Sequence, residues 1–187
     1  MTNNPPSTAR LRRTLLMLAL PTALLASACS TGAAATEQDS LRGQLRELLD
    51  RQEIQALVDR LTAAVDEGRF DAFTTIYTAD VTAKSPGGEA RGREAVIALA
   101  SRNYSSERHE SHYISNVQID LESDRAAVRA NTIFTIFPTV AVAGRMAPEP
   151  LFTSGGPYRF EAVRTTEGWR FSRVETQPLW STGTLPT

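Results

Sequence analysis

The chain has 187 residues, of which 41% are hydrophobic and 22% are charged, and its 20 basic and 21 acidic side chains nearly cancel. This length suits one domain with appendages, and the composition is that of a soluble globular protein, which excludes disorder throughout. Without an excess of positive charge, nucleic-acid binding has no support. The single cysteine, Cys29, leaves the folded domain without a disulfide, a thiol nucleophile or a cysteine metal site.

The first 28 residues have the layout of a bacterial export signal. Three arginines precede an apolar run over residues 15–28, which is too short for a membrane-spanning helix. Residues 25–29, Leu-Ala-Ser-Ala-Cys, resemble a lipoprotein signal, so we expect lipid attachment at Cys29 and an exported protein anchored on the outer side of a bacterial membrane. Plain secretion is the alternative, and both the general and the twin-arginine export routes stay open. Small polar residues over 29–40 predict a flexible tether.

A long amphipathic helix is predicted next. Leucine, isoleucine and valine recur from Leu41 to Val65 at three-and-four spacing, and Gly68 predicts the end of the helix. Asp50 resembles the first residue of a capping box, where the helix would restart. Asp66 falls in the last turn, where the helix dipole disfavours a carboxylate. An inward-facing Asp66 would need a partner, whereas a solvated carboxylate at the helix end fits the sequence equally well.

The remaining elements predict an α+β domain over residues 41–180, with helices on one side of a curved sheet that could enclose a cavity. Two further helices precede a series of β-rich runs. The expected elements are a short helix over 70–77, a strand near 78–82, a turn at 85–88, a helix that starts within 91–94 and runs through Leu99, strands over 112–121 and 126–137, an irregular loop over 138–157, strands over 158–163 and 169–176, and a tail over 181–187.

The first long strand opens on one of the two histidines. In an extended chain His112, Ile114, Asn116 and Gln118 share one face, which makes the histidine face the more polar one. Polar residues that face inward would indicate a hollow sheet with a pocket. A hydrogen-bonded structural histidine is the alternative that the residues leave open.

Four segments in this order resemble the SnoaL-like branch of the nuclear transport factor 2-like superfamily. They are VDEGRFDAFTTIYTADV, GREAVIAL, HYISNVQI and GWRFSRVETQPLW, and the resemblance covers about residues 48–180. It implies a cone-shaped barrel made from a curved, mixed and mostly antiparallel sheet, with three N-terminal helices. Scytalone dehydratase and hexachlorocyclohexane dehydrochlorinase are the branch members that look most similar. Both use an aspartate and a histidine to remove a proton during elimination.

The resemblance also implies site residues. His112 opens the His-Tyr-x-x-Asn pattern, and Asp66 occupies the place of the aspartate at the end of the first helix. Asn131 is implied as a counterpart of a pocket asparagine, and we expect Tyr77 or Trp180 to close part of the same pocket. One departure is Leu61, which stands where relatives often have a tyrosine. That position therefore supplies no hydroxyl to a substrate.

Two functions follow as expectations. The first is a lyase or isomerase that acts on a small apolar molecule without a cofactor, with His112 as base and Asp66 as its orienting partner. The sequence has no phosphate-binding loop, no dinucleotide fingerprint and no metal-ligand cluster. The second is an exported module that binds a small molecule or a partner without catalysis. Relatives commonly form dimers through the open face of the sheet, so a homodimer is expected in either case.

Overall fold

A computed structural model describes residues 24–139, 143–144 and 146–186, with the side chains of residues 24–33 excepted. The chain divides into two units, residues 1–43 and residues 44–187. In the first unit the described part is helical, and the side chains of residues 34–43 are exposed. The second unit contains the sheet and the elements that cover it.

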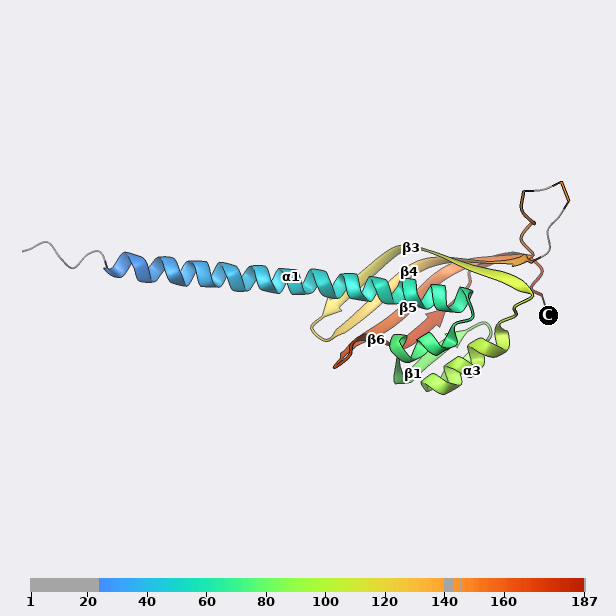
Figure 1. Ribbon diagram of the computed structural model, residues 1–187, viewed down its shortest axis with the longest axis horizontal. Coiled ribbons are helices and arrows are strands. Elements are labelled where there is room, and N and C mark those ends of the chain that lie inside the picture. Colours follow the sequence, from blue (N-terminus) through green and yellow to red (C-terminus); the bar gives the residue numbers. More distant parts are fainter. Residues whose placement is uncertain (1–23, 140–142, 145, 187) are drawn as a thin grey trace, which may run out of the picture. The chain divides into compact units, whose positions relative to one another are not determined.

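The helical elements all precede the long strands in the sequence (Figure 1). They are α1 (Leu24–Asp66), a 3-10 turn (Phe70–Ala72), α2 (Phe73–Ile76) and α3 (Arg93–Asn103). The strands are β1 (Tyr77–Ser85), β2 (Gly88–Arg91), β3 (Arg108–Glu122), β4 (Arg125–Pro138), β5 (Phe152–Thr165), β6 (Gly168–Thr176) and β7 (Trp180–Gly183). Within this unit the predicted α+β class is confirmed.

The strands form one mixed, curved sheet in the order β2-β1-β6-β5-β4-β3, and β7 pairs with β5. Only β1 and β6 are parallel among these pairs, so the sheet is mostly antiparallel, as expected. The two ends of the order, β2 and β3, do not pair with each other in the described residues. The sheet is therefore curved and not closed, and β3 is an edge strand.

The second half of α1 packs on one face of this sheet. Its side chains Ile54, Leu57, Val58 and Leu61 are fully buried. Burying an aliphatic side chain of this size contributes about 1.5 to 3 kcal/mol, so this stripe accounts for much of the attachment of the helix. The rest of the core comes from the inward face of the sheet, from α2 and from α3, and includes Val81, Val96, Val128, Phe160, Trp169 and Phe171.

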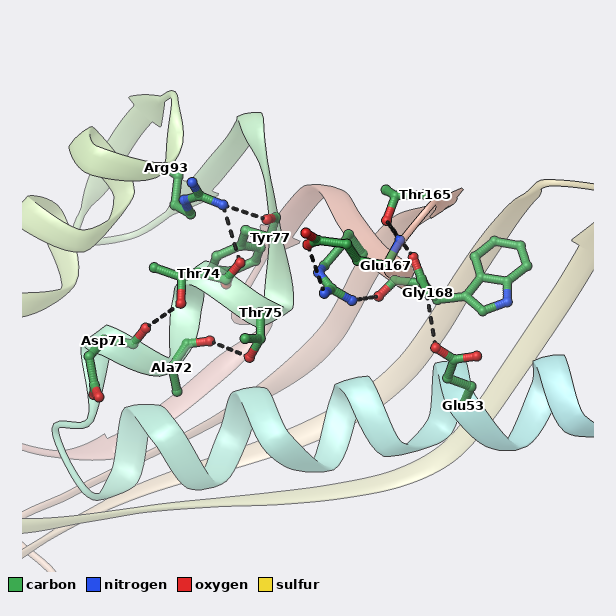
Figure 2. A network of polar contacts seen from close by, with 12 residues as sticks. Glu53, Asp71, Ala72, Thr74, Thr75, Tyr77, Arg93, Thr165, Glu167 and Gly168 are labelled. Atoms are coloured by element: carbon green, nitrogen blue, oxygen red, sulfur yellow. Dashed lines mark hydrogen bonds and ion pairs between the residues drawn. The ribbon is translucent and has the colours of Figure 1, made fainter.

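A buried carboxylate attaches α1 to the turn between β5 and β6. Asp50 is 6% exposed, and its two oxygens accept hydrogen bonds of 2.8 and 2.5 Å from the Arg164 guanidinium. The indole N–H of Trp169 donates to the same carboxylate at 3.2 Å, and Arg164 lies 4.7 Å from the centre of the Trp169 ring. Three residues further along α1, the Glu53 carboxylate accepts a hydrogen bond from the backbone N–H of Trp169 and lies next to Gly168 (Figure 2).

Two arginines make further polar contacts, one from α3 and one from α1. Arg93, the first residue of α3, donates hydrogen bonds to the carbonyl oxygens of Thr74 and Tyr77 (Figure 2). Arg51 of α1 donates to the carbonyl oxygen of Ile119 at 2.5 Å, which ties the helix to the edge strand β3. Helix α1 is therefore bonded both to strands β5 and β6 and to the edge strand β3.

Several predicted boundaries were wrong. Helix α1 begins at Leu24, so residues 29–40, expected to be a flexible tether, are helical. It runs through Asp50 without a restart, because that carboxylate bonds Arg164 instead of capping a helix. The expected irregular loop is shortened because β5 begins at Phe152, and part of the expected tail forms β7. Of the predicted signal, residues 1–23 lie outside the described residues, as does the side chain of Cys29.

A β-bulge changes which residues of β3 face inward. The pairing of β3 with β4 shifts between Ser115 and Gln118, and Asn116 in this interval has a φ of 54°. Beyond the bulge Val117 and Ile119 pack against the core together with Ile114, while Asn116 and Gln118 are exposed. The predicted alternation thus failed after Ile114, and the inward face is more apolar than expected.

The Asp50 anchor leads to a prediction for stability. Hydrogen bonding from Arg164 holds the pKa of the Asp50 carboxyl below its ordinary value. Asp50→Asn leaves the guanidinium without this charge, and since Arg164 is only partly buried we expect unfolding to require about 2 to 3 kcal/mol less in a urea titration at pH 7. A carboxyl with a lowered pKa stabilises the folded protein fully at pH values above about 3.9, its pKa in the unfolded chain. The stabilisation is lost as the pH falls through the pKa of the folded protein.

The difference between wild type and variant should accordingly shrink below about pH 4. Asp59→Asn is the matched control, because Asp59 lies on the exposed side of the same helix and should change stability by no more than about 0.5 kcal/mol. Equal losses from the two variants would contradict the anchoring role of Asp50.

Candidate active site

The structure brings Asp66 and His112 together. The Nδ1 atom of His112 lies 2.5 Å from Oδ1 of Asp66, and the backbone N–H of His112 donates to Oδ2 at 2.9 Å. Both side chains remain partly accessible, with 22% of Asp66 and 16% of His112 exposed. His112 on the sheet therefore binds both oxygens of the Asp66 carboxylate at the end of α1.

Local geometry explains this contact. Asp66 is the last residue of α1, and Gly68, with a φ of 67°, lets the chain turn away from the helix beside the Tyr104 ring. His112 lies on the edge strand β3, and in an antiparallel pair alternate N–H groups of an edge strand point away from the sheet. The Asp66 carboxylate accepts one of these groups. It thereby gains two donors at a helix end whose dipole disfavours it.

The contact determines which nitrogen of His112 can act as a base. Asp66 as a carboxylate can only accept hydrogen bonds, so the neutral imidazole carries its proton on Nδ1. The lone pair is then on Nε2, which forms no hydrogen bond with the described residues. A carboxylate on one nitrogen stabilises the cation that forms when the other nitrogen takes a proton. This pair has the chemistry of a general base.

Aromatic residues surround the pair. The Phe134 ring lies 4.6 Å from the imidazole, on the strand next to His112. Tyr158 on β5 is 7% exposed, and burial together with the negative charge of Asp66 raises the pKa of its hydroxyl. That hydroxyl stays protonated near neutral pH and forms no hydrogen bond with the described residues. The candidate site is therefore apolar on the Phe134 side and has a proton-bearing oxygen near Asp66.

Two of the other expected site residues lie elsewhere. Asn131 is exposed on β4, between the buried Ala130 and the inward-facing Thr132, so it points to the opposite face of the sheet from His112. Trp180 is 49% exposed and covers Gly155, on that same opposite face. The expectation that Asn131 and Trp180 line a pocket with the Asp66–His112 pair was wrong.

Tyr77 is buried in the core. Its ring packs edge to face against Phe73 at 4.9 Å, and burial raises the pKa of its hydroxyl well above the ordinary value. The nearby Tyr158 contributes to this shift. Tyr77 is thus part of the core, and no contact of its side chain with Asp66 or His112 is found among the described residues.

Sequence reasoning missed three residues of the site: Phe134, Tyr158 and Thr132. Thr132 faces inward, and its Oγ1 atom is buried without a hydrogen-bond partner in the described residues. The small apolar residues Ala126, Val128 and Ala130 alternate along β4 and all face the core. Extending this alternation would have placed Thr132 and Phe134 inward and Asn131 outward, which is the arrangement found.

A separate hollow of about 430 Å³ lies on the opposite face of the sheet. It is lined by charged side chains and by parts of β4 and β5, and does not include Asp66 or His112. Its charged residues are Asp120, Arg129, Arg159, Glu161, Arg173 and Glu175. The groups suited to proton transfer are Asp66 and His112, which lie outside this hollow. In the described residues no group of three or more His, Cys, Asp or Glu side chains is placed to hold a metal ion.

Comparison with known proteins identifies the family. The model of the SnoaL-like domain matches residues 46–175. The chain belongs to the SnoaL-like domain family. The predicted resemblance is thereby confirmed, and other matching structures are named as nuclear transport factor 2-like proteins. Uncharacterized protein Rv2910c of Mycobacterium tuberculosis is 28% identical over 134 residues, which cover 70% of this chain and 87% of that protein.

Two solved structures illustrate what this fold carries. A hexachlorocyclohexane dehydrochlorinase (LinA, type 2) is 20% identical with a TM-score of 0.63, over 77% of this chain and 95% of that one. A proposed scytalone dehydratase from Novosphingobium aromaticivorans is also 20% identical with a TM-score of 0.63, over 75% and 91% of the two chains. At these identities the similarity establishes the shared fold.

Proposed function

We propose that this SnoaL-like protein is a cofactor-independent lyase that removes water or a halide from a small, mostly apolar molecule. The observation that carries the proposal is the contact between Asp66 and His112, because it directs a basic Nε2 away from the carboxylate. The apolar ring of Phe134 beside the imidazole favours an apolar substrate. The fold shared with a dehydrochlorinase and a proposed dehydratase supports the same class of reaction.

In the proposed step, Nε2 of His112 takes a proton from carbon. The electron pair of that C–H bond forms a C=C bond, and the bond from the neighbouring carbon to the leaving group breaks with its electrons on that group. Asp66 stabilises the imidazolium that forms and fixes the ring. Leu61, the departure from the expected pattern, is fully buried in the core and supplies no hydroxyl to this step.

A matched pair of probes tests this proposal: β-chloropropiophenone and β-hydroxypropiophenone both eliminate to phenyl vinyl ketone, which chromatography can quantify. We expect His112→Gln to lower the turnover of both by about a hundredfold to ten-thousandfold, because the glutamine amide is not a base. Asp66→Asn should slow both less, because the imidazolium loses its counter-charge.

His109→Gln is the control for the first variant, because His109 is exposed on the same strand and should leave turnover unchanged. Ligand affinity, measured by thermal shift, should be similar in wild type and His112→Gln. If wild type and His112→Gln bind the probes and return both unchanged, the enzyme proposal fails and the non-catalytic binding module is the better account.

We also propose a homodimer through the outward face of the sheet. Tyr113, Ile133, Gly155 and Trp180 occupy paired positions on four neighbouring strands. The side chains of Tyr113, Ile133 and Trp180 are 57%, 44% and 49% exposed. A row of exposed apolar residues on one face suits a partner surface, and a two-fold axis would place the row against its own copy.

Ile133→Arg should convert such a dimer to a monomer, because it places two like charges in the apolar centre of the interface. Sedimentation analysis measures the mass in solution. Leu45→Arg introduces the same charge at a similarly exposed leucine on α1 and should not change the mass. A monomeric wild type, or the same mass for all three proteins, would contradict the proposed interface.

The proposed site of action is outside the cytoplasm, with the chain anchored by lipid at Cys29. Support comes from the arginines and apolar run that precede this cysteine. In the part of the chain that the structure describes, no helix is long and apolar enough to cross a membrane. Fractionation of cells that produce wild type and Cys29→Ala tests the anchor. We expect wild type in the membrane fraction and the variant released from it, whereas two soluble cytoplasmic proteins would contradict export.

A further inference from the structure

The Oγ1 atom of Thr132 is buried and forms no hydrogen bond with any described residue. Most buried hydroxyl groups in proteins are hydrogen-bonded, so an unpartnered one calls for an explanation. Only one other described side-chain atom shares this property, Oγ1 of Thr78 on β1. Strand β1 is separated from β4 by β6 and β5 in the sheet, so the two hydroxyls belong to different regions.

Thr132 lies beside the Asp66–His112 pair. It pairs with Ile114 on β3, and Phe134, two residues further along β4, pairs with His112. Thr132 and His112 are therefore diagonal neighbours on the same face of the sheet, a relation that places Cα atoms about 7 to 8 Å apart. On its other side Thr132 pairs with Gly156, beside which the backbone of residues 177–179 passes. A small molecule in contact with Nε2 of His112 would thus have Thr132 within reach.

The side chain of Thr132 as a whole is only partly buried. Threonine exchanges its hydroxyl and methyl positions by rotation about χ1, and both arrangements are common. Because the hydroxyl has no partner in the free protein, this rotation gives up no hydrogen bond. A ligand with an oxygen atom at this place would therefore recruit the hydroxyl without competition from the protein.

We propose that Thr132 binds the oxygen of the leaving group and makes the site selective for dehydration over loss of halide. This inference rests on the proposed function. His112 takes the proton from carbon, the C–O bond breaks as the C=C bond forms, and the imidazolium returns its proton to the departing hydroxide to give water. Thr132 donates a hydrogen bond to that oxygen as negative charge develops and keeps its own proton. A chloride ion leaves without a proton and needs this help less.

The inference predicts opposite effects on stability and on activity. Thr132→Val keeps the shape of the side chain and removes the unpartnered hydroxyl, so the free protein should be as stable as wild type or more stable. The same variant should lower the turnover of β-hydroxypropiophenone about tenfold, the usual effect of one hydrogen bond, and that of β-chloropropiophenone less than about threefold. Thr132→Ser, which retains the hydroxyl, should restore the selectivity.

Thr78→Val is the matched control, because it removes the other unpartnered hydroxyl at a distance from the site. It should leave the ratio of the two turnover rates unchanged. A Thr132→Val variant that is less stable, or that slows both probes equally while His112→Gln abolishes both, would overturn the role of Thr132 and leave the proposed function intact. If His112→Gln has no effect on either probe, the proposed function fails and the role of Thr132 fails with it.

Discussion

The buried bond between Asp50 and Arg164 determines where α1 lies on the sheet, and the candidate site depends on that position. Asp50 and Asp66 are both on α1, sixteen residues apart, which corresponds to about 24 Å along a helix axis. Since Arg164 and the indole of Trp169 hold the first carboxylate, the second is brought to the edge strand β3. Apolar packing alone would tolerate sliding along the helix axis, whereas a two-pronged guanidinium contact does not.

The sequence predicted the fold class and the family correctly, whereas the pairing of Asp66 with His112 was implied by the resemblance to that family and not by a local signal. Helix periodicity and Gly68 placed Asp66 at a helix end, and a β-rich pattern placed His112 on a strand. The direction of the other side chains depends on strand alternation, which a single bulge reverses. No residue near Asn116 signals that bulge clearly, so the inward face of β3 could not be predicted beyond Ile114.

Long-range pairing limited the prediction in a different way. The Asp50–Arg164 bond joins residues 114 positions apart, and in the sequence Asp50 matches a helix-capping pattern equally well. Trp180 was expected to close part of the pocket, but β7 pairs with β5 and carries the indole to the outward face. Which face a terminal strand joins depends on contacts across the whole sheet. The chemistry of the residues was therefore easier to predict than their partners.

The two hydrogen bonds between His112 and Asp66 separate two tasks that a single hydrogen bond would combine. The imidazole ring changes its charge when Nε2 gains or loses a proton, but the backbone N–H that binds Oδ2 is always neutral. The end of α1 thus remains fastened to β3 in every protonation state of the ring. A base built in this way can complete a cycle of proton uptake and release while the scaffold around it stays still.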